Sequence, residues 1–318
     1  MPPLGIGTWQ WGDRFIWGYG RRYREDDLKE AFFTAVRHGI RLFDTAEMYG
    51  LGRSETLLGM FLKEYEKSAE AYEQNMAVGT VRLVEGALSS KRASSSALVL
   101  VSKFFPYPWR MHPSDLIRAL NKTLKRLDRS KLDLYLLHWP WGPRSIETWM
   151  EAMAEAVRRG LVRAVGVSNC TVEQLKRAQD RLSRYGIPLA ANQVEYSLLV
   201  RSPENNGLLS YMRSSGVRLM AYSPLAMGWL TGRYTIEHPP GGYRNRYRRD
   251  PRLPIVLQTL REIAQKHKAE PAHIALAWLI TKGAVPIPGA THARQAASNA
   301  MALAVQLDEE DVERLDQV

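Results

Sequence analysis

Residues 40–50, with the sequence IRLFDTAEMYG, place a short apolar run directly before a group of polar side chains. The run follows an amphipathic stretch at residues 25–39, so the order predicts a helix and then a buried strand. Polar residues at the end of a buried strand, here Asp44 and Tyr49, are typical of sites at the carboxyl edge of a parallel sheet.

The same unit recurs along the chain. Eight apolar runs begin near residues 4, 40, 97, 132, 161, 189, 217 and 284. Helical patterns lie between them, at residues 25–39, 54–67, 113–127, 145–160, 171–186 and 271–283. Strands that alternate with helices predict a parallel sheet, and eight such units predict a closed α/β barrel of the (β/α)8, or TIM, type. We expect residues 1–318 to form a single domain.

Two segments interrupt this alternation. Residues 65–96 are rich in Ser, Ala and charged residues and delay the third strand, which predicts an exposed insertion. Residues 226–253 follow the seventh strand and are rich in Gly, Pro and Arg, which predicts a long loop on the active-site face.

Composition narrows the class of protein. Apolar residues make up 45% of the chain and charged residues 24%, as in a soluble globular protein. No apolar run is long enough to cross a bilayer, and no signal peptide is evident, so we expect a cytoplasmic protein. The single cysteine, Cys170, can form neither an internal disulfide nor a Cys-rich zinc site, and we expect no metal.

The net charge of +11 raises the question of polyanionic partners. The densest basic run, YRNRYRR at residues 243–249, lies in no recognised nucleic-acid module, so we interpret it as a solvated loop near the barrel mouth. We expect neither a nucleic acid nor a membrane as partner. A basic surface also suits a phosphate-rich dinucleotide.

Familiar catalytic and cofactor motifs are absent from the sequence. Gly5 and Gly7 are not followed by the third glycine of GxGxxG, which removes the main argument for a Rossmann fold. The sequence also lacks GxxxxGK[ST], HExxH, GxSxG and a Tyr-x-x-x-Lys dyad.

Ionisable residues at three successive strand ends are the stronger signal. Taken singly, Asp44 and Glu47 resemble a capping box, Tyr49 a packed aromatic, Lys103 a solvated charge and His138 a core histidine. Together they predict a site, because a lysine at the end of the apolar run ALVLVS needs an anionic partner, and Asp44 is the candidate. The ammonium would then lower the pKa of Tyr49.

Such a tyrosine suits carbonyl reduction. Hydride addition leaves negative charge on the carbonyl oxygen, which a positioned acid must protonate. We expect Tyr49 to be that acid, with Lys103 tuning it, Asp44 holding Lys103 and His138 orienting the substrate. A cofactor must supply the hydride, since no side chain can.

Seven motifs in order, DTAEMYG, SK, LLHWP, GVSN, NQVEYS, YSPL and IPGA, resemble the aldo-keto reductase superfamily over residues 4–317. The resemblance implies a (β/α)8 barrel, a monomer, a small carbonyl substrate and NADPH as cofactor, with NADH as the alternative. It maps the family's catalytic tetrad onto Asp44, Tyr49, Lys103 and His138. The tryptophan-rich opening resembles a plant and algal subset that includes pyridoxal reductases and plastid proteins, which implies the plastid stroma as the alternative location.

The resemblance also implies a set of cofactor-binding residues. Ser168, Asn169 and Gln193 would hold the nicotinamide carboxamide, and Tyr222 would stack on the ring. The remaining positions would contact the pyrophosphate, the adenosine or the base of the cofactor cleft: Gly7, Thr8, Trp9, Ser223, Pro224, Leu225, Gly228, Ile287, Gly289, Thr291, Gln295 and Asn299. The usual Lys-Ser…Arg pattern facing the 2′-phosphate is replaced by Gly289-Ala290…Gln295, with Arg294 nearby.

Other expectations concern the barrel rim and the type of function. Trp9, Trp11, Phe104, Trp109, Trp139 and Trp141 are predicted to line a pocket for flat or apolar carbonyls or, for about half of them, to pack the rim. The sequence reaches its first strand without the short hairpin that usually plugs the barrel bottom in this family. The alternative function is a cofactor-binding regulatory module resembling the β subunits of potassium channels.

Overall fold

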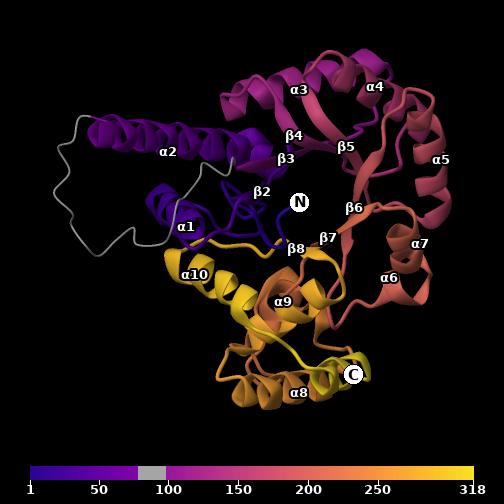
Figure 1. Ribbon diagram of the computed structural model, residues 1–318. Coiled ribbons are helices and arrows are strands. Elements are labelled where there is room, and N and C mark those ends of the chain that lie inside the picture. The colour runs from indigo at the N-terminus through magenta and orange to yellow at the C-terminus, as the bar shows by residue number, and fades with distance from the viewer. Residues whose placement is uncertain (78–97) are drawn as a thin grey trace.

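The computed structural model describes residues 1–77 and 98–318, and its centre is a sheet of eight parallel strands (Figure 1). The strands pair in sequence order, each with the next. Their bounds are β1 (Gly5–Gly7), β2 (Leu42–Asp44), β3 (Val99–Phe104), β4 (Leu132–Leu137), β5 (Val162–Ser168), β6 (Leu189–Glu195), β7 (Arg218–Tyr222) and β8 (Val285–Pro286). The predicted (β/α)8 barrel is confirmed.

The barrel closes where β1 meets the residues after β8. The Gly7 N–H donates a hydrogen bond to the Pro288 carbonyl at 3.0 Å, and Gly7 forms a parallel bridge with Gly289. A Cβ on Gly7 would lie 2.7 Å from the Ile287 carbonyl oxygen, so only glycine allows this approach. Trp11 reinforces the seam, because its Nε1 donates to the Ala290 carbonyl at 2.8 Å.

Helices surround the strands (Figure 1). Those in the described part of the chain are α1 (Glu25–Arg37), α2 (Arg53–Ala77), α3 (Pro113–Leu127), α4 (Ile146–Arg158), α5 (Val172–Ser183), α6 (Ser202–Asn205), α7 (Leu208–Ser214), α8 (Leu253–Lys266), α9 (Pro271–Thr281), α10 (Ala293–Met301) and α11 (Glu309–Asp316). Local signals fix their starts: Thr171 and Gln174 form a capping box for α5, and Pro113 opens α3. Within residues 1–77 and 98–318, no helix is long and apolar enough to cross a bilayer.

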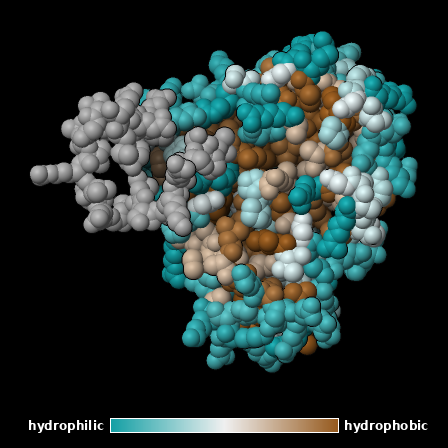
Figure 2. All heavy atoms as spheres, in the orientation of Figure 1, coloured by the Kyte–Doolittle hydropathy of each residue, from teal (hydrophilic) through white to brown (hydrophobic). Residues whose placement is uncertain are grey.

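Figure 2 shows hydrophilic side chains over the outer helices and hydrophobic side chains gathered in the middle of this face. The barrel interior holds its own apolar cluster, which includes Leu42, Val101, Leu136, Ala191 and Met220. Side chains of a strand alternate between its two faces, so the residues two positions later also point inward. Those residues are Asp44, Lys103, His138, Gln193 and Tyr222. The alternation of side chains along the strands thus places five predicted site residues in one layer inside the barrel, directly above the apolar cluster.

Two segments differ from the predicted pattern. Helix α2 continues to Ala77, so residues 65–77 of the predicted insertion are helical, and residues 78–96 lie outside the described residues. The predicted long loop at residues 226–253 contains two short 3₁₀ helices, η2 (Ala226–Thr231) and η3 (Gly242–Tyr247). Helix α8, which follows it, was missing from the predicted helices.

Gly59 tests the packing of α2 against α3. A Cβ at this position would lie 2.4 Å from the Arg126 carbonyl oxygen and 2.9 Å from two Leu127 backbone atoms. We expect Gly59→Ala to lower the free energy of unfolding by about 1–3 kcal/mol, because neither backbone can move away freely. Urea unfolding followed by circular dichroism measures this. The control is Met60→Ala, because Met60 is the next residue in the helix and is 49% exposed. This variant should change the free energy of unfolding by less than about 0.5 kcal/mol. Equal midpoints for the two variants would contradict the close approach.

Candidate active site

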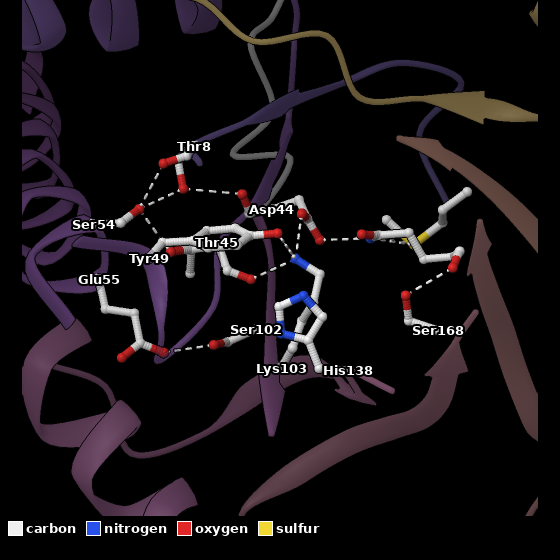
Figure 3. A network of polar contacts seen from close by, with 12 residues as sticks. Thr8, Asp44, Thr45, Tyr49, Ser54, Glu55, Ser102, Lys103, His138 and Ser168 are labelled. Carbon is white, nitrogen blue, oxygen red and sulfur yellow. Dashed lines mark hydrogen bonds and ion pairs between the residues drawn. The ribbon is translucent and has the colours of Figure 1, made fainter. Parts of the chain in front are cut away.

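Lys103 is fully buried at the end of β3, and its ammonium group makes three contacts (Figure 3). Nζ lies 2.5 Å from Asp44 Oδ1, 2.7 Å from the Thr45 carbonyl oxygen and 3.3 Å from the Tyr49 hydroxyl. Asp44 Oδ2 in turn accepts a hydrogen bond from Gln193 Nε2 at 2.8 Å. The structure therefore brings together side chains from β2, β3 and β6 that are up to 149 residues apart.

The charge states of Lys103 and Asp44 depend on two opposing effects on their pKa values, burial and the neighbouring charged groups. Burial lowers the pKa of Lys103, but Asp44 and Tyr49 outweigh it and leave the pKa above its usual value. Burial likewise raises the pKa of Asp44, opposed by Lys103 and Gln193. Lys103 is thus an ammonium whose charge is balanced by one carboxylate.

Tyr49 lies beside Lys103, with Nζ 4.8 Å from the centre of its ring. The Trp9 ring packs at 6.4 Å on one side and the His138 ring at 5.7 Å, edge-on, on another. The predicted lowering of the Tyr49 pKa is wrong. Burial raises this pKa by more than the Lys103 ammonium lowers it, so the phenol keeps its proton at neutral pH.

His138 follows β4 and is 7% exposed. Its backbone N–H donates to the Phe104 carbonyl at 2.8 Å, and its carbonyl accepts from Asn169 Nδ2 at 3.2 Å. Within the described residues the buried Nδ1 atom has no hydrogen-bond partner. Burial, aided by Lys103, holds the pKa of this histidine well below its usual value. The imidazole is therefore neutral at physiological pH.

A network of hydroxyl groups supports the turn between β2 and Tyr49 (Figure 3). Ser54 Oγ contacts Thr8 Oγ1 at 2.7 Å and Thr45 Oγ1 at 2.9 Å, and Thr8 Oγ1 donates to the Asp44 carbonyl at 3.0 Å. All four residues are buried. Thr8, predicted to contact cofactor, is thus engaged in supporting Asp44, and the sequence interpretation missed Ser54 and Thr45.

A second buried carboxylate holds β3 from the outer side. Glu55, at the start of α2, accepts hydrogen bonds from Ser102 Oγ at 2.5 Å and from Arg126 Nε at 2.6 Å. Ser102 precedes Lys103, so the two side chains point to opposite faces of the strand. Burial raises the pKa of Glu55, and Arg126 opposes this. Sequence reasoning missed Glu55, although a glutamate in the first turn of an apolar helix is a usable signal.

The ends of β5 and β7 bring three more predicted residues next to Gln193 of β6. Ser168 Oγ donates to the Gln193 carbonyl at 2.8 Å, and Asn169 Nδ2 donates to Ser168 Oγ at 3.0 Å. The Tyr222 hydroxyl donates to Asn169 Oδ1 at 3.0 Å. Asn169 has a φ of 59°, a left-handed conformation that turns its amide across the strand ends. These residues join the Lys103 group through Gln193 and His138.

The segment after β7 has an unusual backbone. Ser223, Ala226 and Met227 have φ values of 50°, 46° and 57°, and Gly228 has 100°. Leu225, with φ −102° and ψ 18°, is followed by the left-handed Ala226, which is the right-handed then left-handed order found in anion-binding nests. The predicted residues Pro224 and Leu225 belong to this turn, where the Leu225 carbonyl accepts from the Gly228 N–H at 2.9 Å.

The predicted residues after β8 lie along the seam and the start of α10. Thr291 donates to Gln295 Oε1 through its N–H at 2.8 Å and through Oγ1 at 3.0 Å. Asn299 Nδ2 donates to the Gly289 carbonyl at 3.3 Å. A Cβ on Gly289 would lie 2.2 Å from Gln10 Nε2, so a larger residue here requires the Gln10 side chain to move. Ile287 belongs to the apolar barrel interior.

The predicted aromatic lining is only partly found. Trp11 and Phe104 are fully buried, Trp11 in the seam and Phe104 against Trp149 with ring centres 4.8 Å apart, so neither lines a pocket. Trp139 and Trp141, which follow His138 in the chain, pack on each other with ring centres 5.9 Å apart. Phe105, which the sequence interpretation missed, contacts His138 edge-on at 5.7 Å.

The basic run at residues 243–249 is held against the barrel. Arg246 pairs with Glu195 at the end of β6 and lies over the rings of Tyr243 and Tyr247. The Arg244 carbonyl accepts from Trp229 Nε1 at 3.0 Å. Part of this charge is therefore used within the protein.

Fold and site together define a class of protein: a barrel with a group of Asp, Tyr, Lys and His side chains at the carboxyl ends of its strands. The chain matches the Aldo/keto reductase family over residues 3–318 and belongs to it. Members of this family are oxidoreductases that act on carbonyls with NADP(H).

Individual relatives support this assignment. The chain is 35% identical to the chloroplastic pyridoxal reductase of Arabidopsis thaliana, covering 98% of this chain and 81% of that protein. It is 28% identical to the NADH-specific methylglyoxal reductase of Escherichia coli, covering 97% and 91%. An aldo-keto reductase from Klebsiella pneumoniae, solved in complex with NADPH, superposes with a TM-score of 0.73 at 29% identity, covering 100% and 90%.

The lowered pKa of His138 is open to direct measurement. Because a histidine is neutral above its pKa, the imidazole should stay neutral from pH 8 down through pH 6. In NMR spectra of histidine-labelled protein, the His138 ring signals, identified by their absence in His138→Asn, should not shift over this range. In denaturant the same ring should titrate near pH 6.5, its ordinary pKa. A folded-state midpoint near 6.5 would contradict the buried environment.

Proposed function

We propose that the protein reduces an aldehyde or ketone to an alcohol by hydride transfer from NADPH, with Tyr49 as the general acid. The observation that carries this proposal is the buried Lys103 ammonium, which contacts both Asp44 and the Tyr49 hydroxyl.

The chemistry follows from the states of these groups. A substrate carbonyl oxygen placed between the Tyr49 hydroxyl and the His138 ring accepts hydrogen bonds from both. As hydride reaches the carbonyl carbon, the O–H bond of Tyr49 breaks and its proton moves to the carbonyl oxygen, giving the alcohol. The phenolate that remains is stabilised by Lys103, and Asp44 keeps that ammonium in place. Because the Tyr49 pKa is raised, the acid is loaded with its proton before each turnover.

The residues present fit a nicotinamide dinucleotide. The amide and hydroxyl groups of Ser168, Asn169 and Gln193 converge beside the Tyr49 group, the chemistry that holds a carboxamide. The turn at residues 223–228 contains the right-handed then left-handed backbone order that is typical of anion-binding nests. When bound, the cofactor supplies the hydride.

The substrate is proposed to be a small carbonyl compound. The name of the Arabidopsis relative makes pyridoxal the first aldehyde to test. The aromatic rings around His138 favour flat molecules of this kind.

Tyr49→Phe tests the general acid. We expect it to lower kcat for aldehyde reduction at least about 100-fold, because proton transfer is lost, while the Kd for NADPH stays within about twofold. Turnover is followed by loss of nicotinamide absorbance, and binding by quenching of tryptophan fluorescence. Tyr211→Phe is the control, because its hydroxyl contacts Gln179 at 2.6 Å outside the barrel, and it should keep full activity.

Two other outcomes would change the proposal. Full turnover by Tyr49→Phe would show that another group donates the proton. Wild-type protein that binds NADPH tightly, reduces no aldehyde or ketone in a broad panel and retains a stable protein partner in pull-downs would favour the regulatory alternative.

Arg294 tests the preference for NADPH. It lines a surface cavity of about 340 Å³ together with His292 and with Asp26, Asp27 and Glu30 of α1. We expect Arg294→Met to weaken NADPH binding about threefold to tenfold and to leave NADH binding unchanged, because only the 2′-phosphate gains from the guanidinium. Fluorescence titration with both dinucleotides measures this. An equal change for both would assign Arg294 no part in cofactor choice.

A further inference from the structure

A bidentate ion pair connects the two loops that follow β2 and β3. Arg110 Nη1 lies 2.5 Å from Glu47 Oε1, and Nη2 lies 2.9 Å from Oε2. The side chains are only 17% and 8% exposed, so water screens the pair weakly. Glu47 precedes Tyr49 by two residues. Taken singly, Glu47 resembled part of a capping box in the sequence, and in the structure its carboxylate pairs with Arg110.

The pair holds the backbone of Phe105 from both sides. The Phe105 N–H donates to Glu47 Oε1 at 2.7 Å, and Arg110 Nη1 donates to the Phe105 carbonyl at 2.7 Å. The guanidinium also lies over the rings of Phe104 at 4.7 Å and Tyr107 at 5.0 Å. Few rotamers of Arg110 satisfy all these contacts, so the loop has little freedom at Phe105.

The ring of Phe105, whose backbone is held in this way, lies next to the residues that are proposed to act on the substrate. Its ring meets the His138 ring edge-on at 5.7 Å and the Trp141 ring edge-on at 5.4 Å. His138 in turn meets the Tyr49 ring at 5.7 Å. Phe105 is partly exposed and Trp141 is 50% exposed, so both rings offer surface beside the two groups that are proposed to bind the carbonyl oxygen.

The barrel does not depend on this pair. Glu55 and Arg126 separately join α2 to α3, and the β3 strand is paired on both sides. The ion pair between Glu47 and Arg110 joins two loops at the barrel mouth, and it therefore affects the position of Phe105 more than the stability of the barrel.

We propose that Glu47 and Arg110 are positioning residues that hold Phe105 as the wall of the carbonyl site, and that this wall selects planar aromatic aldehydes over saturated ones. The inference rests on the proposed function and names the substrate class of that same site. A flat ring gains an offset or edge-on contact with Phe105 that a puckered ring of equal size does not make.

The test compares benzaldehyde with cyclohexanecarbaldehyde, which have the same carbon count and differ in planarity. We take the ratio of their kcat/KM values and normalise it to wild type, so intrinsic reactivity cancels. Phe105→Leu should lower the ratio about threefold to tenfold, mainly through a higher KM for benzaldehyde. Arg110→Met should lower it similarly. Adding Arg110→Met to Phe105→Leu should change the ratio no further, because both act through one ring.

Controls separate positioning from stability. Arg110→Met leaves Glu47 buried without its partner, so Glu47→Gln with Arg110→Met removes both charges and should fold while showing the same lowered ratio. Arg177→Met breaks a comparable bidentate pair with Glu147 between α4 and α5, at 2.7 and 3.0 Å, and should leave the ratio unchanged. The Kd for NADPH should stay within about twofold in every variant.

The same ratio can be measured without turnover, as Kd values of benzamide and cyclohexanecarboxamide from calorimetry. An unchanged ratio in the Arg110 variants, or additive effects of Arg110→Met and Phe105→Leu, would overturn the inference while leaving the proposed function intact. Absence of turnover by wild type, with the amide ratio lowered in the variants as expected, would overturn the proposed function and keep the inference.

Discussion

The buried ion pair between Lys103 and Asp44 is the constraint on which the rest of the site depends. An ammonium removed from water without a partner costs several kcal/mol, so the barrel must supply one carboxylate and two further oxygens around it. Asp44, the Thr45 carbonyl and the Tyr49 hydroxyl meet that need. Each is delivered by β2 and the turn after it, which explains the dense polar support from Thr8 and Ser54 behind that turn.

Much of this arrangement could be predicted from the sequence, because strand order and period are local properties. Apolar runs gave eight strands, and strand ends gave the four residues that the structure brings together. Two of the predictions that failed illustrate the physical reasons. The first is the shift of the Tyr49 pKa. Its direction depends on how deeply the hydroxyl is buried, which the sequence of one strand does not show, and burial raises the pKa by more than Lys103 lowers it. The second is the predicted place of Phe104 in the pocket lining. Phe104 follows Lys103 directly, and because side chains alternate along a strand, it lies on the outer face of the barrel. The sequence contains this signal, but the predicted pocket lining did not take it into account.

Other features could not be predicted because they arise from contacts between loops. Nothing near Glu47 in the sequence indicates that its partner is Arg110, 63 residues later. The extent of α2 was missed because its later residues, rich in Ser, Ala and Glu, lack the apolar stripe that marks a packed helix. The site nevertheless divides into two halves. The ends of β2 to β4 carry its ionisable groups, and the ends of β5 to β8 carry its amide, hydroxyl and backbone groups. Hydrogen bonds of Gln193 and Asn169 connect the two halves.

The seam between Gly7 and Gly289 has a consequence for how the chain folds. The hydrogen bond from Trp11 to Ala290 spans 279 residues, so the barrel cannot close until almost the whole polypeptide is available. Contacts between such distant segments carry a large loop-closure entropy and form late. During synthesis, strands β1 to β4 emerge from the ribosome first and must wait, with their apolar inner faces open, for the last two strands. This half-barrel is the species on which a chaperone or an aggregation reaction would act.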